Sequence, residues 1–134
     1  MQNLAKENKR EAILNAAFTT FKNYGYRKTS MHDVATALGI SRASLYSYFE
    51  NKDDIFRCVL ISVTESGLVE AKRCLGLSAL DLTSRVEAAL LARYLPLHQM
   101  LIESVHGEEI AETYFRLCGD SFADSFAQSK DILT

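Results

Sequence analysis

The stretch that decides the fold runs from Thr29 to Lys52 and reads TSMHDVATALGISRASLYSYFENK. Ser30 can cap a helix whose third residue, Asp33, returns a hydrogen bond to the cap, which is the pattern of a capping box. Gly39 can adopt the positive φ of a tight turn, and Ser41 can cap a second helix. The stretch therefore predicts two short helices joined by a three-residue turn. This is the helix-turn-helix arrangement, in which the second helix enters the major groove of DNA.

The residues before this stretch predict a first helix. Gly25 follows them and is suited to end a helix in the left-handed conformation. Apolar side chains recur upstream at helical spacing and form one stripe, which is Ile13, Leu14, Ala17, Phe18, Phe21 and Tyr24. This helix and the two short ones would make a three-helix head.

The residues after this stretch predict further helices. Asn51 can cap a fourth helix that runs to about Cys74. Ser78 and Asp81 repeat the capping box and open a fifth helix. The apolar face expected for that helix is Leu82, Val86, Ala89 and Leu90.

Pro96 should interrupt the fifth helix and occupy the first turn of a sixth. Gly107 should then introduce a last amphipathic stretch, with apolar positions Ala111, Phe115, Cys118, Phe122 and Phe126. No alternating strand pattern exceeds four residues, so the predicted fold class is all-α.

The composition is that of a soluble globular protein. Hydrophobic residues make up 48% and charged residues 24% of the 134 residues. No apolar run reaches the roughly 18 residues of a membrane span, and the polar N-terminus does not resemble a signal peptide. The three cysteines lie far apart without a CxxC pair, which predicts buried thiols rather than disulfides or zinc ligands. We expect a cytoplasmic protein without membrane contact, cofactor or metal. No nucleophile-base set suggests an enzyme.

The net charge of −2 conceals an asymmetry along the chain. Residues 1–52 carry eight basic and four acidic side chains, whereas the remaining residues carry seven basic and thirteen acidic ones. A polyanion would therefore be attracted to the first part and repelled by the second.

The third predicted helix has an outer surface suited to nucleic acid. Leu45 and Phe49 should face the core, which leaves its other side chains outside: Arg42, Ala43, Ser44, Tyr46, Ser47 and Tyr48. Hydroxyl groups and Lys52 can bind phosphate oxygens, and Arg42 can bind guanine O6 and N7 in bidentate fashion.

The order T-S-x-x-D-V-A-x-x-L-G-I-S-x-x-S-L-Y-x-Y-F-x-N-K-x-x-I resembles the TetR (tetracycline-repressor-like) family, as does A-I-L-x-A-A-x-x-x-F-x-x-x-G-Y in the first helix. The resemblance is specific over residues 11–60. It implies a homodimer with a DNA-binding head, residues 1–54, and a helical ligand-binding and dimerisation domain, residues 55–134.

By position, the resemblance assigns roles to individual residues of the head. Arg42 and Ala43 would read bases, while the tyrosines and Lys52 would clamp phosphates. The full predicted DNA-binding set is Ser30, His32, Ser41, Arg42, Ala43, Ser44, Tyr46, Ser47, Tyr48 and Lys52.

The aromatic residues of the second half recur at helical spacing and are typical of a core. By resemblance, however, the core of such a domain encloses a cavity for a small effector of apolar or amphipathic character. The candidate lining residues are Tyr94, Met100, Tyr114, Phe115 and Phe122.

The favoured interpretation is a repressor that binds a palindromic operator and is released by a small molecule. The alternative is a helical ligand-binding or interaction protein that does not recognise a DNA sequence. The resemblance also implies two further long helices. Because Ile132 and Leu133 are still in apolar phase near the end, we expect the chain to be C-terminally incomplete or an unusually short member.

Overall fold

The computed structural model describes residues 2–117 and residue 119. Over these residues the chain contains helices and no strand, which confirms the predicted all-α class. No helix in this part is long and apolar enough to cross a membrane. The predictions for Cys118, Phe122 and Phe126, and for the residues up to the C-terminus, lie outside the described residues.

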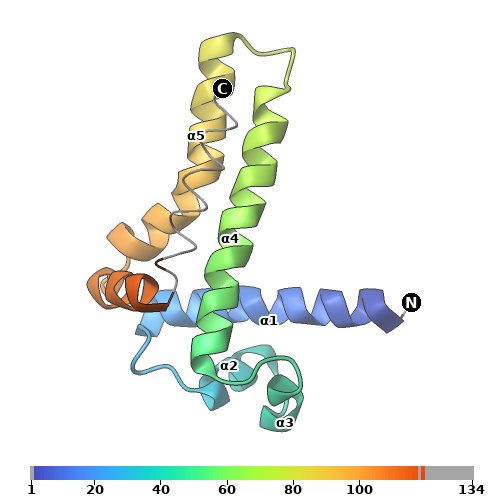
Figure 1. Cartoon of the computed structure of the whole chain (residues 1–134), viewed down its shortest axis with the longest axis vertical. Coiled ribbons are helices and arrows are strands. Elements are labelled where there is room, and N and C mark those ends of the chain that lie inside the picture. Colours follow the sequence, from blue (N-terminus) through green and yellow to red (C-terminus); the bar gives the residue numbers. More distant parts are fainter. Residues whose placement is uncertain (1, 118, 120–134) are drawn as a thin grey trace.

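Three helices form the head: α1 (Gln2–Tyr24), α2 (Met31–Leu38) and α3 (Arg42–Tyr46). Figure 1 shows α2 and α3 below α1, which lies across the start of the next helix. Gly25 ends α1 with a φ of 83°, as predicted. The core is aromatic, and the rings of Phe21 and Phe56 meet edge to face at 5.3 Å. Such pairs add to the free energy gained from burial alone.

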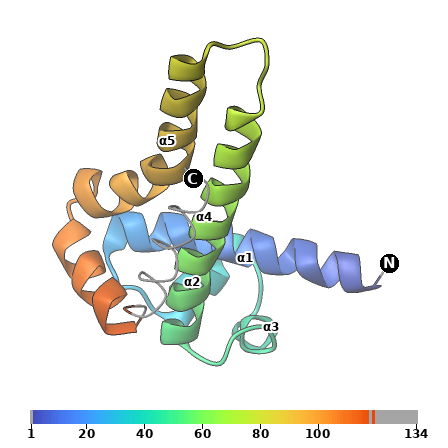
Figure 2. The same ribbon diagram turned by 45° about the horizontal axis from the view of Figure 1, so that its top comes forward.

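Two long antiparallel helices, α4 (Lys52–Leu75) and α5 (Leu82–His98), form a hairpin that rises from the head (Figures 1 and 2). Asn51 caps α4 by accepting a hydrogen bond from the Asp54 amide at 2.8 Å. The helix pair packs through small side chains, with Ala71, Cys74 and Ala89 buried between them. At Gly67 the approach is closest, because a Cβ there would lie 3.1 Å from the carbonyl oxygen of Arg93.

This close packing makes the predicted apolar face of the fifth helix wrong. Ala89 is buried, but Leu82 and Leu90 are 72% and 46% exposed. Small residues allow the two backbones to approach each other, so they occupy the contact line and the large apolar side chains point away from it. The start of α5 also differs from the prediction. Asp81, not Ser78, is the N-cap, and it accepts a hydrogen bond from the Ser84 amide at 2.7 Å.

Pro96 does not interrupt α5, contrary to the prediction. The helix continues through it to His98 and then widens into a π-helix, η1 (Gln99–Glu103). A proline removes the hydrogen bond to the carbonyl four residues earlier, here that of Ala92. That carbonyl lies on the line of closest approach, 3.2 Å from the position of a Cβ on Gly67. The wider π turn directly afterwards redirects the chain towards the head.

Residues 107–117 are helical and return to the head. Met100, Ile110 and Tyr114 are buried in the same core cluster as the head residues. The helix does not bury the predicted stripe, because Phe115 is 64% exposed. The head core therefore includes side chains from both sides of the boundary predicted at residue 54.

Candidate nucleic-acid interface

The start and end of α2 follow the local rules of the sequence. The Ser30 hydroxyl accepts a hydrogen bond from the Asp33 amide at 3.1 Å, and the Ser30 amide donates to the Asp33 carboxylate at 2.8 Å. The Ser30 backbone amide first, and then the Ser30 side chain, act on the Asp33 carboxylate and hold its pKa below its usual value. Gly39 ends the helix with a φ of 75°, and its amide donates to Thr36 at 3.1 Å. The predicted capping box and turn are confirmed.

The recognition helix α3 is short and anchored by two buried side chains. Ser41 caps it by accepting a hydrogen bond from the Ser44 amide at 3.0 Å. Leu45 and Phe49 are buried in the head core as predicted, although α3 ends at Tyr46 and Phe49 lies beyond it. Burial of these two residues fixes which side of α3 faces outwards.

The predicted DNA-binding residues of α3 lie on that outer side. Ser44 and Tyr48 are half-buried, and the exposed ones are Ser41, Arg42, Ala43, Tyr46 and Ser47. The Ser47 hydroxyl donates to the Ser44 carbonyl at 2.5 Å, which ties down the C-terminal turn. This surface has hydroxyl groups and a guanidinium but no carboxylate from Ser41 to Tyr48, so it is suited to a polyanion.

Two candidates lie at the start of α2. Ser30 and His32 are exposed, and His32 Nε2 lies 3.5 Å from the Thr36 hydroxyl. Ser30 has a structural role as the helix cap.

Lys52 lies at the start of α4 and is half-buried. Its Nζ donates a hydrogen bond to the Tyr26 carbonyl at 2.9 Å and lies 4.1 Å from the centroid of the Tyr26 ring. Burial lowers the pKa of Lys52, while the charge of Glu109 raises it and that of Arg116 lowers it. The ammonium thus joins the start of α4 to the loop between α1 and α2. Because an ammonium has three N–H donors, the phosphate contact of Lys52 stays a prediction.

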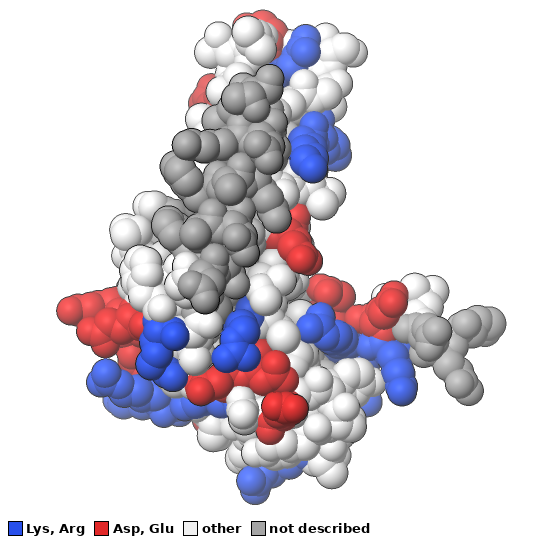
Figure 3. All heavy atoms as spheres, in the orientation of Figure 1, with Lys and Arg blue, Asp and Glu red and all other residues white. Residues whose placement is uncertain are grey.

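Residues 104–116 contact the end of α1, the same loop and the start of α4. The Ser104 hydroxyl donates to the Lys22 carbonyl at 2.6 Å, and the Arg27 amide donates to the Glu109 carboxylate. A further ion pair joins Arg116 to Asp53 at 3.6 Å. Charged side chains of both signs gather over the head in Figure 3. The orientation of the head thus depends on contacts with the segment that follows α5.

An open groove of about 450 Å³ lies between α1 on one side and α4 and α5 on the other. Its walls are mostly apolar, with amide, hydroxyl and carboxylate groups among them. The lining residues include Glu11, Leu14, Asn15 and Phe18 from α1, Ser62, Val63, Ser66 and Gly67 from α4, and Pro96 and Gln99 beyond them.

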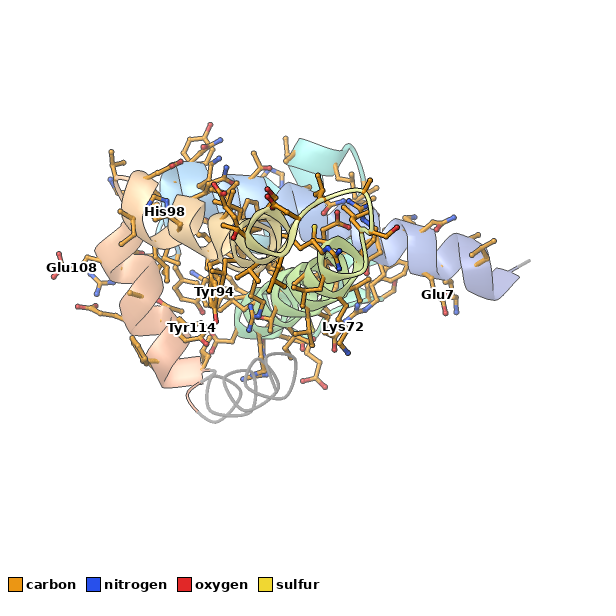
Figure 4. All side chains as sticks on the ribbon, turned by 90° about the horizontal axis from the view of Figure 1, so that it is seen from above. Glu7, Lys72, Tyr94, His98, Glu108 and Tyr114 are labelled. Carbon is orange, nitrogen blue, oxygen red and sulfur yellow. The ribbon has the colours of Figure 1, made fainter. Side chains whose placement is uncertain are left out.

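The predicted effector-lining residues do not line this groove. Met100 and Tyr114 come together in the head core, and Tyr94 and Phe115 are exposed on α5 and on residues 107–117. Figure 4 shows Tyr94 and Tyr114 on these separate elements. None of the four candidates that the structure describes lines this groove, and their assignment to an effector site stays a prediction. Aromatic spacing identifies a buried or an exposed stripe equally well, and sequence alone does not show which helices leave space between them.

Two basic residues near the recognition helix were missed as site residues. Lys9 Nζ lies 5.8 Å from the centroid of the Tyr48 ring, and Arg10 Cζ lies 5.4 Å from that of Phe49. The spacing in the sequence could have placed them on the side of α1 that packs onto the head. Arg10 lies three residues and Lys9 four residues before Ile13, which is buried in the head core.

Comparisons with known proteins give one consistent result. The family description "Bacterial regulatory proteins, tetR family" matches residues 13–59. Over 74 residues, 55% of this chain, there is 39% identity to the uncharacterized HTH-type transcriptional regulator YfiR of Bacillus subtilis. Over 51 residues, 38% of this chain, there is 41% identity to the HTH-type transcriptional repressor ComR of Escherichia coli. These matches span 34% and 24% of the relatives' own lengths, so the chain spans about a third or less of them.

The fold also matches a solved structure. A crystal structure of a TetR family transcription regulator from Marinobacter aquaeolei superposes with a TM-score of 0.70 at 21% identity. The match covers 99% of this chain and 68% of that one. The capped α2, the positive-φ turn at Gly39 and the anchored α3 lie within the matched residues. Residues 13–59 are therefore similar to the bacterial regulatory proteins of the tetR family, and the fold of the chain is that of a TetR family regulator.

Proposed function

We propose that this chain is a DNA-binding transcriptional repressor whose head reads an operator through α3. The observation that carries the proposal is the outer surface of α3. It presents a guanidinium, two tyrosines and several hydroxyl groups without a carboxylate, while Leu45 and Phe49 hold the helix rigidly from beneath. A rigid support matters because base readout needs donors and acceptors at fixed positions.

The repressor would act as a homodimer on a palindromic operator. Two heads then contact half-sites about 34–36 Å apart, which is one turn of DNA. The exposed apolar side chains of α5, among them Leu90, Leu91 and Leu95, support a partner surface on the hairpin. The ComR name describes a repressor, which favours repression over activation.

The groove between α1 and the hairpin is the proposed effector site. One wall belongs to the head and the other to the hairpin, so an amphipathic molecule in the groove would favour one angle between them. An effector that binds one head orientation more tightly shifts the population towards it. A shifted head spacing would no longer match the operator, and the repressor would dissociate.

Selection of duplexes from a randomised DNA library, followed by fluorescence anisotropy, tests the proposal. We expect enrichment of a palindrome, and we expect Arg42→Ala to weaken binding by roughly 1–3 kcal/mol and relax the preference at one base pair. Lys72→Ala, at the far end of α4, is the matched control for lost charge. If the library yields no preferred sequence, the helical interaction-protein alternative is favoured. Preserved selectivity in Arg42→Ala would refute base readout by Arg42 on α3.

A further inference from the structure

The N-terminal part of α1 projects beyond the rest of the head. The first buried residue of the helix is Ile13, and residues 4–11 are exposed. At 1.5 Å per residue, Lys6 lies about 10 Å along the axis from Ile13. Figures 1 and 2 show this part of α1 extending past α3 on the side of the N-terminus. A helix of more than two exposed turns needs a reason to be present, since it adds little to the core.

Three cations on this projection share one side of the helix. Lys6, Lys9 and Arg10 lie at helical spacing from one another and from Ile13, so they continue the face that packs onto the head further along. Glu7 lies beside this row, three residues before Arg10, whereas Glu11 lines the groove. The row therefore carries a net positive charge on the side of α1 that packs onto the head.

Two contacts fix this row of cations relative to α3. Lys9 lies over the ring of Tyr48, and Arg10 lies over the ring of Phe49, at 5.8 and 5.4 Å from the ring centroids. Tyr48 follows α3 directly, so the ammonium of Lys9 is beside the end of the proposed DNA-reading surface. Lys6, about one turn further out, extends the same row away from the head.

The N-terminal part of α1 has a positive electrostatic character. The N-terminus of a helix carries partial positive charge, and the first turn of α1 has no acidic residue to offset it. Cations near this end raise the positive potential of an exposed surface. Such a surface is suited to an anionic partner.

We propose that Lys6, Lys9 and Arg10 form a second contact with DNA, to the phosphate backbone flanking the base pairs read by α3. The inference rests on the proposed function, because it requires that α3 be placed in the major groove. The contact adds affinity without reading sequence, since phosphates are the same at every base pair.

The salt dependence of DNA binding by Lys6→Ala/Lys9→Ala tests this contact. Each phosphate contact contributes about 0.9 to the slope of log K against log salt, so the double variant should lower the slope by about 1.8 per head. Between 50 and 200 mM salt, the wild type should lose about tenfold more affinity per head than the variant. Alanine is a strong helix former, so both exposed substitutions keep α1 helical, which circular dichroism checks.

Three comparisons make the result decisive. Lys72→Ala removes a charge far from the head and should keep the wild-type slope. Figure 4 shows the separation, because it labels Lys72 on α4 and Glu7 on the projecting part of α1. Removing the base pairs that flank the selected site should weaken the wild type more than the double variant, which keeps only Arg10 of the three cations. If wild type and Lys72→Ala bind and the double variant keeps their slope, the second contact is refuted while the proposed function stands. If the wild type binds no duplex, the proposed function itself fails.

Discussion

The closest approach of α4 and α5, at Gly67, gives a quantitative prediction. An added Cβ would lie 3.1 Å from the carbonyl oxygen of Arg93 and 3.2 Å from that of Ala92. Both neighbours are backbone atoms of a helix, so they cannot rotate away as a side chain could. Gly67→Ala must therefore push α5 outwards or strain both helices.

Two terms of opposite sign determine the free energy of unfolding of Gly67→Ala. Replacing glycine by alanine inside a helix stabilises it by roughly 1 kcal/mol. Overpacking a close contact costs typically 1–3 kcal/mol. Gly76→Ala is the matched control, because a Cβ there would lie at an ordinary 3.5 Å from the Arg73 carbonyl oxygen. We expect Gly67→Ala to be less stable than Gly76→Ala by about 1–3 kcal/mol.

Thermal unfolding at a fixed protein concentration measures this difference. At about 2.1 cal/mol/K per residue, a chain of 134 residues changes its Tm by roughly 3.5 °C per kcal/mol. The two variants should therefore differ by about 4–11 °C in Tm. Equal Tm values would refute the argument that Gly67 is required for the close packing of the hairpin.

Three further predictions concern the head. Gly39→Val should weaken DNA binding and destabilise the head by about 1–2 kcal/mol in a denaturant titration. The cause is backbone strain at a φ of 75°, because a Cβ at this position meets open space. Asparagine tolerates that φ, so Gly39→Asn should lose less stability in the same titration. The pKa of Asp33 is lowered in the folded state, so its carboxylate contributes stability above its ordinary pKa of 3.8, and this contribution is lost as the pH falls below 3.8. The difference in free energy of unfolding between the wild type and Asp33→Asn should therefore shrink as the pH is lowered through that value. A difference that stays constant with pH would contradict the capping role. Lys52→Ala should lower the Tm, because the hydrogen bond to the Tyr26 carbonyl is lost. A weaker DNA affinity with an unchanged Tm would instead support a role for Lys52 as a phosphate clamp.

The local features of the head could be predicted from sequence because they depend on residues three or four positions apart. The capping box of Ser30 and Asp33, the cap at Ser41 and the positive φ of Gly39 all follow from side chains and amides within one helical turn. The spacing of Leu45 and Phe49 then identified the buried side of the recognition helix. Free-energy terms of this kind are nearly independent of the rest of the chain.

The features that were mispredicted depend on partners distant in sequence. Pro96 stays within α5, and its i−4 carbonyl lies close to Gly67 on α4. The contact between Lys52 and the Tyr26 carbonyl was not predicted at all, because the two residues come within reach only after the loop before α2 folds back.

The sequence by itself determined the end of α1 at Gly25, the N-caps of α2 and α3, and which face of the recognition helix is outside. Only the tertiary structure decided which face of α5 packs, where a groove opens between α1 and the hairpin, and which cations of α1 lie beside Tyr48. The physical reason is the range of the interactions. Capping and helical phase act within a turn, whereas interhelical distance depends on the smallest side chain that either helix presents at the crossing.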